Sequence, residues 1–553
     1  PFTFPTVAVE GEVLAFLESE AGENATGGNG DDDAVDGVLR IFRLGMGETP
    51  LVRQSAIDGT PNVDGAPLAI SAGRVFVRTA EADNAAATLQ RASVADGGGE
   101  TQFGGDDGAI SADGRYVAFD TASPNVIGPG NDTNGTADVF RHDLVTNATI
   151  RVSVPTGGAG QSDAAALFPA ISRDGRFIAF TSGATNLLGP GGDTNGNIDV
   201  FVHDTVTQVT ERVNVAFGGG QSVGLANYDD VDISDDGRFV AFVSDAADLL
   251  PPGEDTNGVR DVFVRDRLTA TTERVSVASD GSEGDDESGG FGRVTLSGDG
   301  NVVAFASRAS NFWPGLPPGT PTAFLRDRAA FVTEPVAFAD PSFGGNALSG
   351  DALPVSFSYD GRFVAFAPSA SPILLPSGKD SNGLADVYVR DRATGIVERV
   401  SLGPDGAQGT GGADATTLDT NSALSADGRY VVFRSDMTNL VPGGTTGPHA
   451  FLHDRVTRTT RQLDVAIDGA PSNGTFVAGT ALSADGRSAL VYTDADNLLG
   501  PGGDGNGNLD TFVIRPDPTD PEGADALFPD GILDDVVLES IDAATGAITT
   551  LCP

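Results

Sequence analysis

Cysteine, lysine and long apolar runs are nearly absent from this sequence, and each absence excludes a class of protein. Cys552 is the only cysteine, so no internal disulfide framework can form. Lys379 is the only lysine, and 33 basic residues face 78 acidic ones, which gives a formal net charge of −45. Such a chain is repelled by nucleic acids and anionic membranes, so we expect neither as a partner. No apolar run approaches the roughly 18 residues of a membrane-spanning helix, so we expect no membrane insertion.

The acidic excess is mostly aspartate, the residue that serves turns and oxygen-ligand metal sites. The alternative is that the acidity only keeps the protein soluble. The sequence begins at Pro1 without a methionine and without a leader-like segment, which fits a mature or trimmed product. We therefore expect a secreted, extracellular or cell-surface protein, with Cys552 as a candidate for an intermolecular contact.

The segment from Leu167 to Val215 is the clearest copy of a unit that recurs along the chain. Its Asp174-Gly175 step predicts a tight hairpin turn, because a glycine there readily adopts positive φ. The predicted strands are Leu167 to Ile171, Arg176 to Phe180, Val200 to Val202 and Arg212 to Val215. Four short strands of this kind form one antiparallel sheet.

The second strand of the unit is apolar on both faces, as in RFIAF and RFVAF. One sheet cannot cover both of its own faces, so neighbouring copies must cover them. The hairpin turns follow one another at intervals of about 60 residues. They lie at Asp113-Gly114-Arg115, Asp174-Gly175-Arg176, Asp236-Gly237-Arg238, Asp299-Gly300-Asn301, Asp360-Gly361-Arg362, Asp427-Gly428-Arg429 and Asp485-Gly486-Arg487.

Seven regular copies, two irregular ones and a last pair of strands predict an all-β fold, a single β-propeller of eight or nine four-stranded blades spanning residues 1–553. Residues 1–108 would form irregular blades, the second of them reduced, and residues 109–515 the regular blades. The strand pair within residues 525–553 would close the ring in its own chain or pair with a neighbouring subunit.

The hairpin motif occurs as SADGRYVAF, SRDGRFIAF, SDDGRFVAF and SYDGRFVAF, and it closely resembles the repeat of TolB-like β-propellers. The D-V-F-V-x-D-x-x-T segment that follows resembles the outer strands of that repeat in secreted bacterial propellers. The resemblance covers about Leu68 to Val513 and implies the propeller fold. It does not imply a function, because such propellers include protein-binding modules, surface proteins and enzyme accessory domains.

A second motif, D-x-N-G-x-x-D, lies between the second and third strands of five units. Hard oxygen ligands at alternate positions, with a glycine at the sharp turn, are what a Ca²⁺ loop requires. The sequence therefore predicts about five structural calcium sites. Their residues are Asp132, Asn134 and Asp138; Asp193, Asn195 and Asp199; Asp255, Asn257 and Asp261; Asp380, Asn382 and Asp386; and Asp504, Asn506 and Asp510.

The calcium interpretation has a plain alternative, since Asp-x-Asn-Gly is also ordinary turn chemistry. The loops are not EF-hands, because the bidentate glutamate at position 12 is missing and a strand follows. Two units have no carboxylate in this loop, at Pro317 to Thr320 and at Gly443 to Thr446, and should bind no ion there. With three side-chain ligands, we expect affinities of roughly 10⁻⁴ to 10⁻³ M, suited to extracellular calcium.

Two other patterns have structural explanations. Gly220-Gln221-Ser222-Val223-Gly224 matches the nucleophile elbow of hydrolases but lies in a blade connection. His142, His203 and His453 share a repeat position with Arg265, Arg326 and Arg390, which predicts an exposed cation. The recurrent aromatic residues of the second and third strands predict packing between blades.

The sequence thus favours a calcium-stabilised, non-catalytic structural or interaction protein, at the cell surface or in an extracellular assembly such as a filament or surface layer. Its partner would be another protein or a second copy of itself, through the C-terminal strands or Cys552. The competing class is a hydrolase or lyase with paired carboxylates in the central channel. No acidic residue stood out from the repeats as a candidate for such a role.

Overall fold

The computed structural model describes the strands of residues 7–80 and then most of the chain from residue 88. The described ranges are 88–337 without 129, 159 and 291–292; 355–368; 384–410; 423–515 without 468–469 and 501–502; 536–542; and 548–552. Two compact units are present, one of residues 1–88 and 515–553 and the other of residues 89–514.

The larger unit consists of seven antiparallel sheets, which we call blades 1 to 7. Blade 1 is β9 Asp106–Ile110, β10 Tyr116–Thr121, β11 Asp138–Asp143 and β12 Ala148–Arg151; blade 2 is β13 Ala166–Ile171, β14 Phe177–Ser182, β15 Asp199–Asp204 and β16 Val209–Arg212. Blade 3 is β17 Ala226–Ile233, β18 Phe239–Ser244, β19 Asp261–Asp266 and β20 Thr271–Arg274; blade 4 is β21 Thr295–Leu296, β22 Val302–Ser307, β23 Thr322–Asp327 and β24 Val332–Pro335. Blade 5 is β25 Val355–Phe357, β26 Phe363–Phe366, β27 Tyr388–Asp391 and β28 Val397–Arg399.

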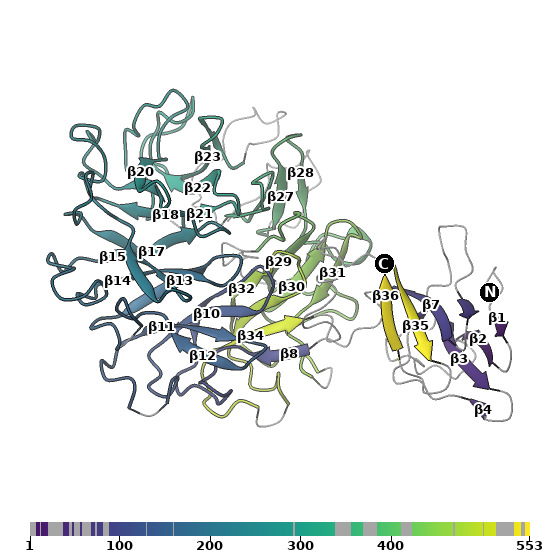
Figure 1. The fold of residues 1–553 in the computed structure, drawn as a ribbon. Coiled ribbons are helices and arrows are strands. Elements are labelled where there is room, and N and C mark those ends of the chain that lie inside the picture. The colour runs from purple at the N-terminus through teal and green to yellow at the C-terminus, as the bar shows by residue number, and fades with distance from the viewer. Residues whose placement is uncertain are drawn as a thin grey trace. The chain divides into compact units, whose positions relative to one another are not determined.

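Blades 6 and 7 depart from this strand order. Blade 6 follows a short 3₁₀ helix, Pro404–Gly406, and consists of β29 Tyr430–Ser435, β30 His449–Asp454 and β31 Thr459–Gln462, with a single bridge from Leu424 to Val431 in the innermost position. Blade 7 is β32 Val477–Leu482, β33 Ala489–Thr493, β34 Asp510–Arg515 and, as its outermost strand, β8 Thr88–Arg91. In Figure 1, β8 in blue lies against β34 in yellow, so strands from opposite ends of the chain complete one blade.

A ring of backbone hydrogen bonds joins the inner hairpins of all seven blades. At each junction a peptide N–H in the S-x-D-G turn donates to a carbonyl oxygen in the next blade, over 2.7 to 3.0 Å. The donor and acceptor pairs are Ala112 and Arg173, Arg173 and Asp235, Asp235 and Gly298, Asp299 and Tyr359, Tyr359 and Ala426, Ala426 and Ala484, and Ala484 and Ala112. The last bond returns to the first blade, which closes the circle.

The prediction of eight or nine blades is therefore wrong: the propeller has seven, each of about the expected architecture. The error came from the irregular repeats of residues 1–108, which were counted as blades. Most of those strands belong to the smaller unit, and only β8 and β9 take part in the ring. A ring whose junctions are already closed by hydrogen bonds has no position for a further blade.

The smaller unit contains two sheets. One is formed by β1 Val7–Glu10, β2 Val13–Ser19, β3 Gly37–Arg43, β4 Gly47–Glu48 and β5 Ala56–Ile57, and the other by β36 Ile548–Cys552, β35 Val536–Asp542, β7 Arg74–Ala80 and β6 Leu68–Ser71. Within this chain, β35 of the C-terminal strand pair lies antiparallel to β7, so the pair belongs to the smaller unit and not to the ring. Residues 525–535 of that predicted segment lie outside the described residues.

Each residue of the hairpin motif has a defined structural task. In blade 2 the hydroxyl of Ser172 donates to Asp174, whose carboxylate also accepts from the backbone N–H of Arg176. The Arg176 guanidinium binds both oxygens of Asp204 at the end of the third strand. Gly175 has φ +69°, and a Cβ there would lie 2.2 Å from Cδ2 of Tyr116 in blade 1. Glycine is therefore required both for the turn and for contact between blades.

The core lies between adjacent blades, as the aromatic pattern predicted. In blades 1 to 6 an aromatic ring of the second strand lies beside one of the third strand, for example Phe180 on Phe201 with 5.9 Å between ring centres. Phe180 and Phe201 are buried in one cluster with Ala118, Val139 and Val152 of blade 1. No helix in the described part of the chain is long and apolar enough to cross a membrane.

Candidate functional site

The aspartate at the seventh position of the D-x-N-G-x-x-D motif is a buried ion-pair partner. It is the first residue of the third strand in blades 1, 2, 3 and 7 and lies two residues before that strand in blade 5. An arginine at the end of the fourth strand pairs with it across the sheet. The pairs, with the distance between Nε or Nη1 of arginine and Oδ2 of aspartate, are Arg151 and Asp138 (3.1 Å), Arg212 and Asp199 (2.9 Å), Arg274 and Asp261 (3.1 Å), Arg399 and Asp386 (3.2 Å), and Arg91 and Asp510 (3.1 Å). In all five blades a guanidinium thus supplies the positive charge.

The second oxygen of this aspartate is also bonded. In blade 1 the hydroxyls of Ser153 and Ser162 donate to Oδ1 of Asp138, and in blade 2 the Asn214 amide donates to Oδ1 of Asp199. Burial raises the pKa of Asp199 to about 6, although the Asn214 and Arg212 bonds oppose that rise. The group is placed for packing and pairing, away from solvent.

The first and third positions of the motif shape the loop itself. In blade 2, Oδ1 of Asp193 accepts the backbone N–H of Asn195, and Oδ1 of Asn195 accepts the backbone N–H of Asn197. The Asn195 amide donates to the carbonyl oxygen of Ser222, which ties the loop to the connection leading to blade 3. Blades 1 and 7 repeat this pattern. These contacts are the turn chemistry of the alternative interpretation.

The two units without the motif show that arginine and aspartate occur together. Blade 4 has Thr322 in place of the aspartate and Pro335 in place of the arginine. Blade 6 has His449 and Gln462 at these positions, and Nδ1 of His449 lies 2.8 Å from Oδ2 of Asp464. Burial lowers the pKa of His449, but its bond to Asp464 raises it, and the net direction is upward. The arginine is present where a buried carboxylate needs a partner.

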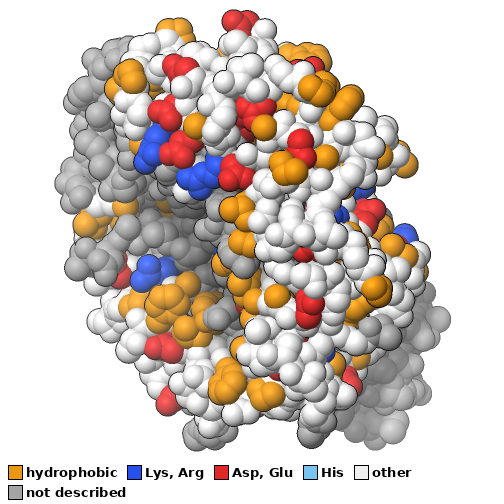
Figure 2. Space-filling view, turned by 90° about the vertical axis from the view of Figure 1, so that its left-hand side faces the viewer, with side chains coloured by type: hydrophobic (Ala, Val, Ile, Leu, Met, Phe, Trp, Pro, Cys, Tyr) orange, Lys and Arg blue, Asp and Glu red, His pale blue; other side chains and the backbone are white. Residues whose placement is uncertain are grey.

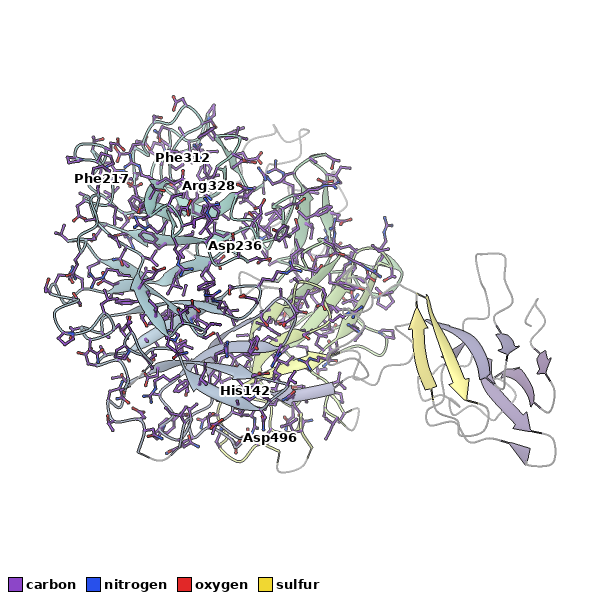
Figure 3. The ribbon with its side chains drawn as sticks, in the orientation of Figure 1. His142, Phe217, Asp236, Phe312, Arg328 and Asp496 are labelled. Atoms are coloured by element: carbon purple, nitrogen blue, oxygen red, sulfur yellow. The ribbon has the colours of Figure 1, made fainter. Side chains whose placement is uncertain are left out.

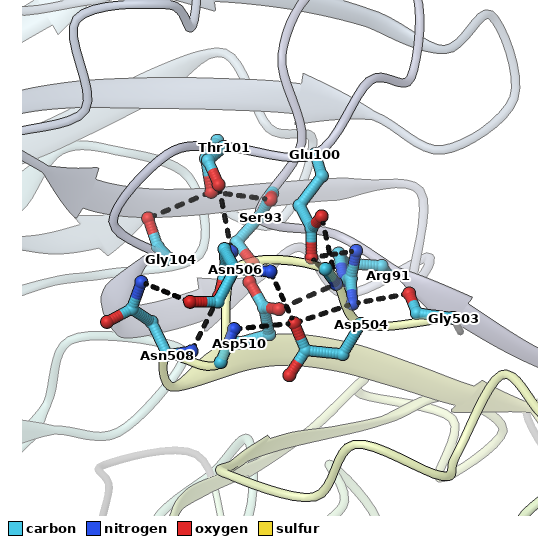
Figure 4. Close-up of polar contacts among 12 residues, drawn as sticks. Arg91, Ser93, Glu100, Thr101, Gly104, Gly503, Asp504, Asn506, Asn508 and Asp510 are labelled. Carbon is cyan, nitrogen blue, oxygen red and sulfur yellow. Dashed lines mark hydrogen bonds and ion pairs between the residues drawn. The ribbon is translucent and has the colours of Figure 1, made fainter. Parts of the chain in front are cut away.

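Two of the loops gather a third carboxylate. Glu100, Asp504 and Asp510 can bring one oxygen each within 4.8 Å of one another, and so can Asp255, Asp261 and Glu283. In the first cluster Arg91 lies between the acids, with Nη1 2.9 Å from Glu100 and Nε 3.1 Å from Asp510 (Figure 4). In the second, Arg274 contacts both Asp261 and Glu283. The acidic clusters could hold a cation, but each already contains a guanidinium.

Five calcium sites are not supported by this geometry. The loops of blades 1 and 2 have a glutamine, Gln161 or Gln221, where the two clusters have glutamate. The Gln221 amide donates to Oδ1 of Asp193, so this loop has an uncharged amide where the two clusters have a third carboxylate. In blade 5, Asp386 is paired with Arg399, while Asp380 and Asn382 lie outside the described residues.

The predicted exposed-cation position is buried. His142, His203 and His453 are at most 2% exposed, and the pKa of each is lowered to about 4, chiefly by burial. His142, labelled in Figure 3, has Nδ1 2.9 Å from Oγ1 of Thr149. The prediction was wrong because burial between blades cannot be read from a position shared with arginine; Arg326 there is buried too.

The central channel of the ring holds a cavity of about 110 Å³. Its walls are the innermost strands and their hairpins, which all seven blades contribute. Two repeat positions contribute to it: the second residue of the S-x-D-G turn in all seven blades, and the residue two places before the turn serine in blades 1, 2, 3 and 7. Because the blades are repeats, a residue that differs from its equivalents in the other blades is not needed for the ring itself.

Polar side chains line the cavity on one side of the ring. At the turn position the residues of blades 1 to 7 are Ala112, Arg173, Asp235, Gly298, Tyr359, Ala426 and Ala484. At the strand position they are Ala109, Ala170, Asp232, Thr295, Ser356, Ala423 and Ala481. At the turn position, charged or aromatic residues occur in blades 2, 3 and 5, and at the strand position the charged residue is Asp232 of blade 3. Blades 1, 6 and 7 have alanine at both positions. We call Arg173, Asp232, Asp235, Arg293 and Tyr359 the polar sector.

The mouth of the channel at the hairpin face is partly covered by three of these side chains. Nη1 of Arg173 lies 3.4 Å from Oδ2 of Asp235, and the guanidinium lies 5.9 Å from the centre of the Tyr359 ring. Gly298 makes this possible, because a Cβ there would lie 2.6 Å from Cδ2 of Tyr359 and 2.8 Å from Oδ2 of Asp235. The Arg173 side chain is 53% exposed.

Asp232 lies deeper in the same wall. One of its oxygens accepts the N–H of Leu296 in blade 4 at 2.7 Å, and the other accepts the N–H of Ile233. Burial raises the pKa of Asp232 to about 7, and the positive charge of Arg293 only partly opposes this. The Arg293 guanidinium lies 5.8 Å from the ring of Phe168, a residue with φ +55°. Burial therefore makes the Asp232 carboxyl harder to ionise than an ordinary aspartate.

Sequence reasoning missed this sector because it treated every aspartate as part of a turn or a loop. The signal was present, since Asp232 and Asp235 interrupt two columns of small residues in the repeats. The elbow-like Ser222 is no substitute for it: its hydroxyl donates to Asp248 at 2.8 Å. Figure 2 shows one hollowed face of the molecule, on which basic side chains lie beside acidic ones. Arg173 and Asp235 form one such ion pair.

No protein-family model and no curated protein matches this chain. Among solved structures, an oligogalacturonate lyase in complex with manganese aligns with 11% identity and a TM-score of 0.43, over 80% of this chain and 94% of its own. TolB from Acinetobacter baumannii aligns with 17% identity and a TM-score of 0.31, over 59% and 58%. The β-propeller domain of the Trilobed protease from Pyrococcus furiosus aligns with 12% identity and a TM-score of 0.41, over 77% and 99%. The chain is a seven-bladed β-propeller on the evidence of its own strand order and closed ring of hydrogen bonds.

Proposed function

We propose that this protein is a non-catalytic recognition module, secreted or displayed at the cell surface, which binds a protein partner at the polar sector of its central channel. The observation that supports the proposal is the restriction of Arg173, Asp235 and Tyr359 to three of the seven blades, where the others have small residues. Residues needed only to hold the ring would repeat in every blade, as the hairpin serine and glycine do.

The size of the cavity supports binding over catalysis. Small-molecule sites are commonly about 300 to 1,000 Å³, whereas this cavity is about 110 Å³. A cavity of this size, open at its mouth, fits the end of a chain or one side chain. The acidic side chains of the repeated loops are already paired with arginine, so they offer no free carboxylate pair for acid and base catalysis.

Site-specific crosslinking tests the proposal. A photoreactive benzoylphenylalanine replaces Tyr359, which is 44% exposed at the channel mouth. The control places the same residue at Phe331, which is 67% exposed on the turn between β23 and β24, outside the channel lining. In cells that produce the protein, we expect a crosslinked protein partner from position 359 and none from 331. The same product from both positions, or none from 359, would refute channel recognition.

A hydrolase or lyase is the second candidate, favoured by Asp232. A carboxyl group with a pKa of about 7 beside a guanidinium is suited to general acid or base catalysis. Panels of acidic polysaccharides and peptides would reveal such an activity as new reducing ends, unsaturated products or released amines. Turnover by the native protein that Asp232→Asn abolishes would establish the enzyme and displace the recognition module.

For calcium, we propose that binding is confined to the two acidic clusters, at Glu100 and at Glu283. Among the described residues, these are the two loops in which a third carboxylate exceeds what one arginine neutralises. An extracellular location, with millimolar calcium, would favour occupancy of such weak sites. Fractionation of producing cells tests the location, since protein retained in the cytoplasm would contradict secretion. Light scattering with and without reductant tests self-association through Cys552.

A further inference from the structure

We propose that the channel mouth recognises a carboxylate, and that its source is the C-terminus of an extended peptide chain whose last side chain is apolar. This inference rests on the proposed function and names the ligand chemistry of the same site. Arg173 is the group that would bind the carboxylate, beside Tyr359 and against the alanine-lined side of the channel.

Arg173 has donors to spare. A guanidinium has five N–H donors, and within the described part of the chain Asp235 is the one hydrogen-bond acceptor of this side chain, through Nη1 at a long 3.4 Å. Arginines of the repeated pairs are engaged more closely: Arg176 binds both oxygens of Asp204 at 2.8 and 2.6 Å. The Arg173 fork is thus set in the mouth with its remaining edge accessible, which suits a planar carboxylate.

The surroundings favour a carboxylate of a particular shape. The ring of Tyr359 lies against the guanidinium and limits its positions, while its hydroxyl accepts or donates no hydrogen bond among the described residues. Opposite the polar sector, Ala112, Ala426 and Ala484 leave room at the mouth for an apolar group. A chain terminus with an apolar last residue matches both sides, and a single residue suits a cavity of about 110 Å³.

The net charge of the protein limits which anionic ligands this site can bind. The chain has a formal net charge of −45, so an anionic ligand is repelled by the molecule as a whole. The net charge repels a strongly anionic partner from the channel, whereas a peptide with a single terminal carboxylate is repelled only weakly. Asp235 lowers the affinity further, because it competes for Arg173 and repels the ligand.

The experiment measures the fluorescence anisotropy of Ala-Ala-Leu that carries an uncharged BODIPY dye at its N-terminus and a free C-terminus. Its binding to the full-length protein is compared with that of the same labelled peptide as the C-terminal amide. We expect the acid to bind about tenfold more tightly than the amide, or better, since a hydrogen bond to a charged partner is lost. Arg173→Gln should remove that preference. Asp235→Asn should do the opposite and tighten the acid about threefold or more, because it frees Arg173 and deletes a like charge.

The matched control is Arg458→Gln, which removes one exposed arginine from the turn between β30 and β31. That turn position has φ +60°, and the equivalent position of blade 2 is already a glutamine, Gln208, with φ +58°. The control variant should fold normally and bind the acid like the native protein.

Each other outcome has a definite meaning. Equal binding of acid and amide, or a weaker acid complex in Asp235→Asn, would overturn the carboxylate inference while leaving channel recognition intact. Competition by 4-methylpentanoate at the same concentration as the peptide would overturn the peptide assignment. Absence of binding by every probe overturns this inference, and the crosslink from position 359 decides separately whether the proposed function survives.

Discussion

Three histidines of this protein should remain neutral at pH values where an ordinary histidine is charged. His142, His203 and His453 occupy one position in blades 1, 2 and 6, and each lies 2.9 Å from a threonine hydroxyl. That hydroxyl donates to a backbone carbonyl of the preceding blade, as Thr149 does to Val94, so Nδ1 must donate to it. In His142 and His203, Nε2 is buried without a partner in the described structure, and a proton there would have no acceptor.

The magnitude follows from the shift in pKa. Burial lowers the pKa of each from 6.5 to about 4, which corresponds to roughly 3 kcal/mol. Because the folded pKa lies below the unfolded one, each histidine leaves stability intact above pH 6.5 and reduces it as the pH falls toward 4. At pH 5 the loss is about 2 kcal/mol per histidine. Asp199, Asp261 and Asp510, with pKa values raised to about 6, act in the opposite direction.

Individual titration separates these opposing contributions. The chain has four histidines, so a sample labelled with ¹³C-histidine should give four ring signals that single His→Gln variants assign. We expect three of them to stay neutral from pH 7 down to about 4.5, and the fourth, His449, to be protonated above pH 6.5 because Asp464 stabilises its cation. Titration of His142, His203 or His453 near pH 6.5 in the folded protein would refute the assignment of these residues to a dry inter-blade position.

Three further predictions concern the loops and the turns. Arg212→Leu should lower the free energy of unfolding by roughly 3 to 5 kcal/mol, because Asp199 is then buried without its partner. Chemical denaturation measures this loss. If adding Ca²⁺ restored the stability of the variant, the assignment of Arg212 as the cation of the loop would be contradicted. The described loops should bind at most two Ca²⁺ ions. Equilibrium dialysis should therefore show a loss of up to two bound ions when Glu100 and Glu283 are both changed to glutamine. Gly237→Ala should destabilise the protein by about 1 to 3 kcal/mol more than Gly196→Ala, since both have φ near +70° but only the former would place its Cβ against Phe177; equal losses would show that the backbone conformation alone matters.

Much of the fold could be predicted because the repeat encodes it locally. The Asp174-Gly175 step sets the hairpin, and the runs of apolar residues on both faces of the second strand require neighbouring blades. The blade count could not be predicted in the same way. Whether β7 pairs in the ring or with β35 depends on contacts between segments more than 450 residues apart, and similar strand patterns serve both arrangements.

The loop chemistry shows the same division. The D-x-N-G-x-x-D spacing specified a turn and a buried final aspartate, and the sequence could not tell which cation neutralises it. The answer lies on another strand: Arg212 reaches Asp199 because β16 pairs with β15 in a fixed register. An arginine at the end of every fourth strand that follows a complete motif was a visible clue, but its meaning required the pairing of the strands.

The sequence by itself therefore determined the repeating unit, the hairpins, the inter-blade aromatic core and the turns of the loops, because each depends on residues close together in the chain. Tertiary structure decided the number of blades, the partner of each buried charge and the polar sector of the channel. These depend on closure of the ring. Closure brings Arg173, Asp235 and Tyr359, which belong to three different blades, to one channel mouth, and it buries His142 between blades. Neighbours created by closure are separated by whole repeats, and no local pattern specifies them.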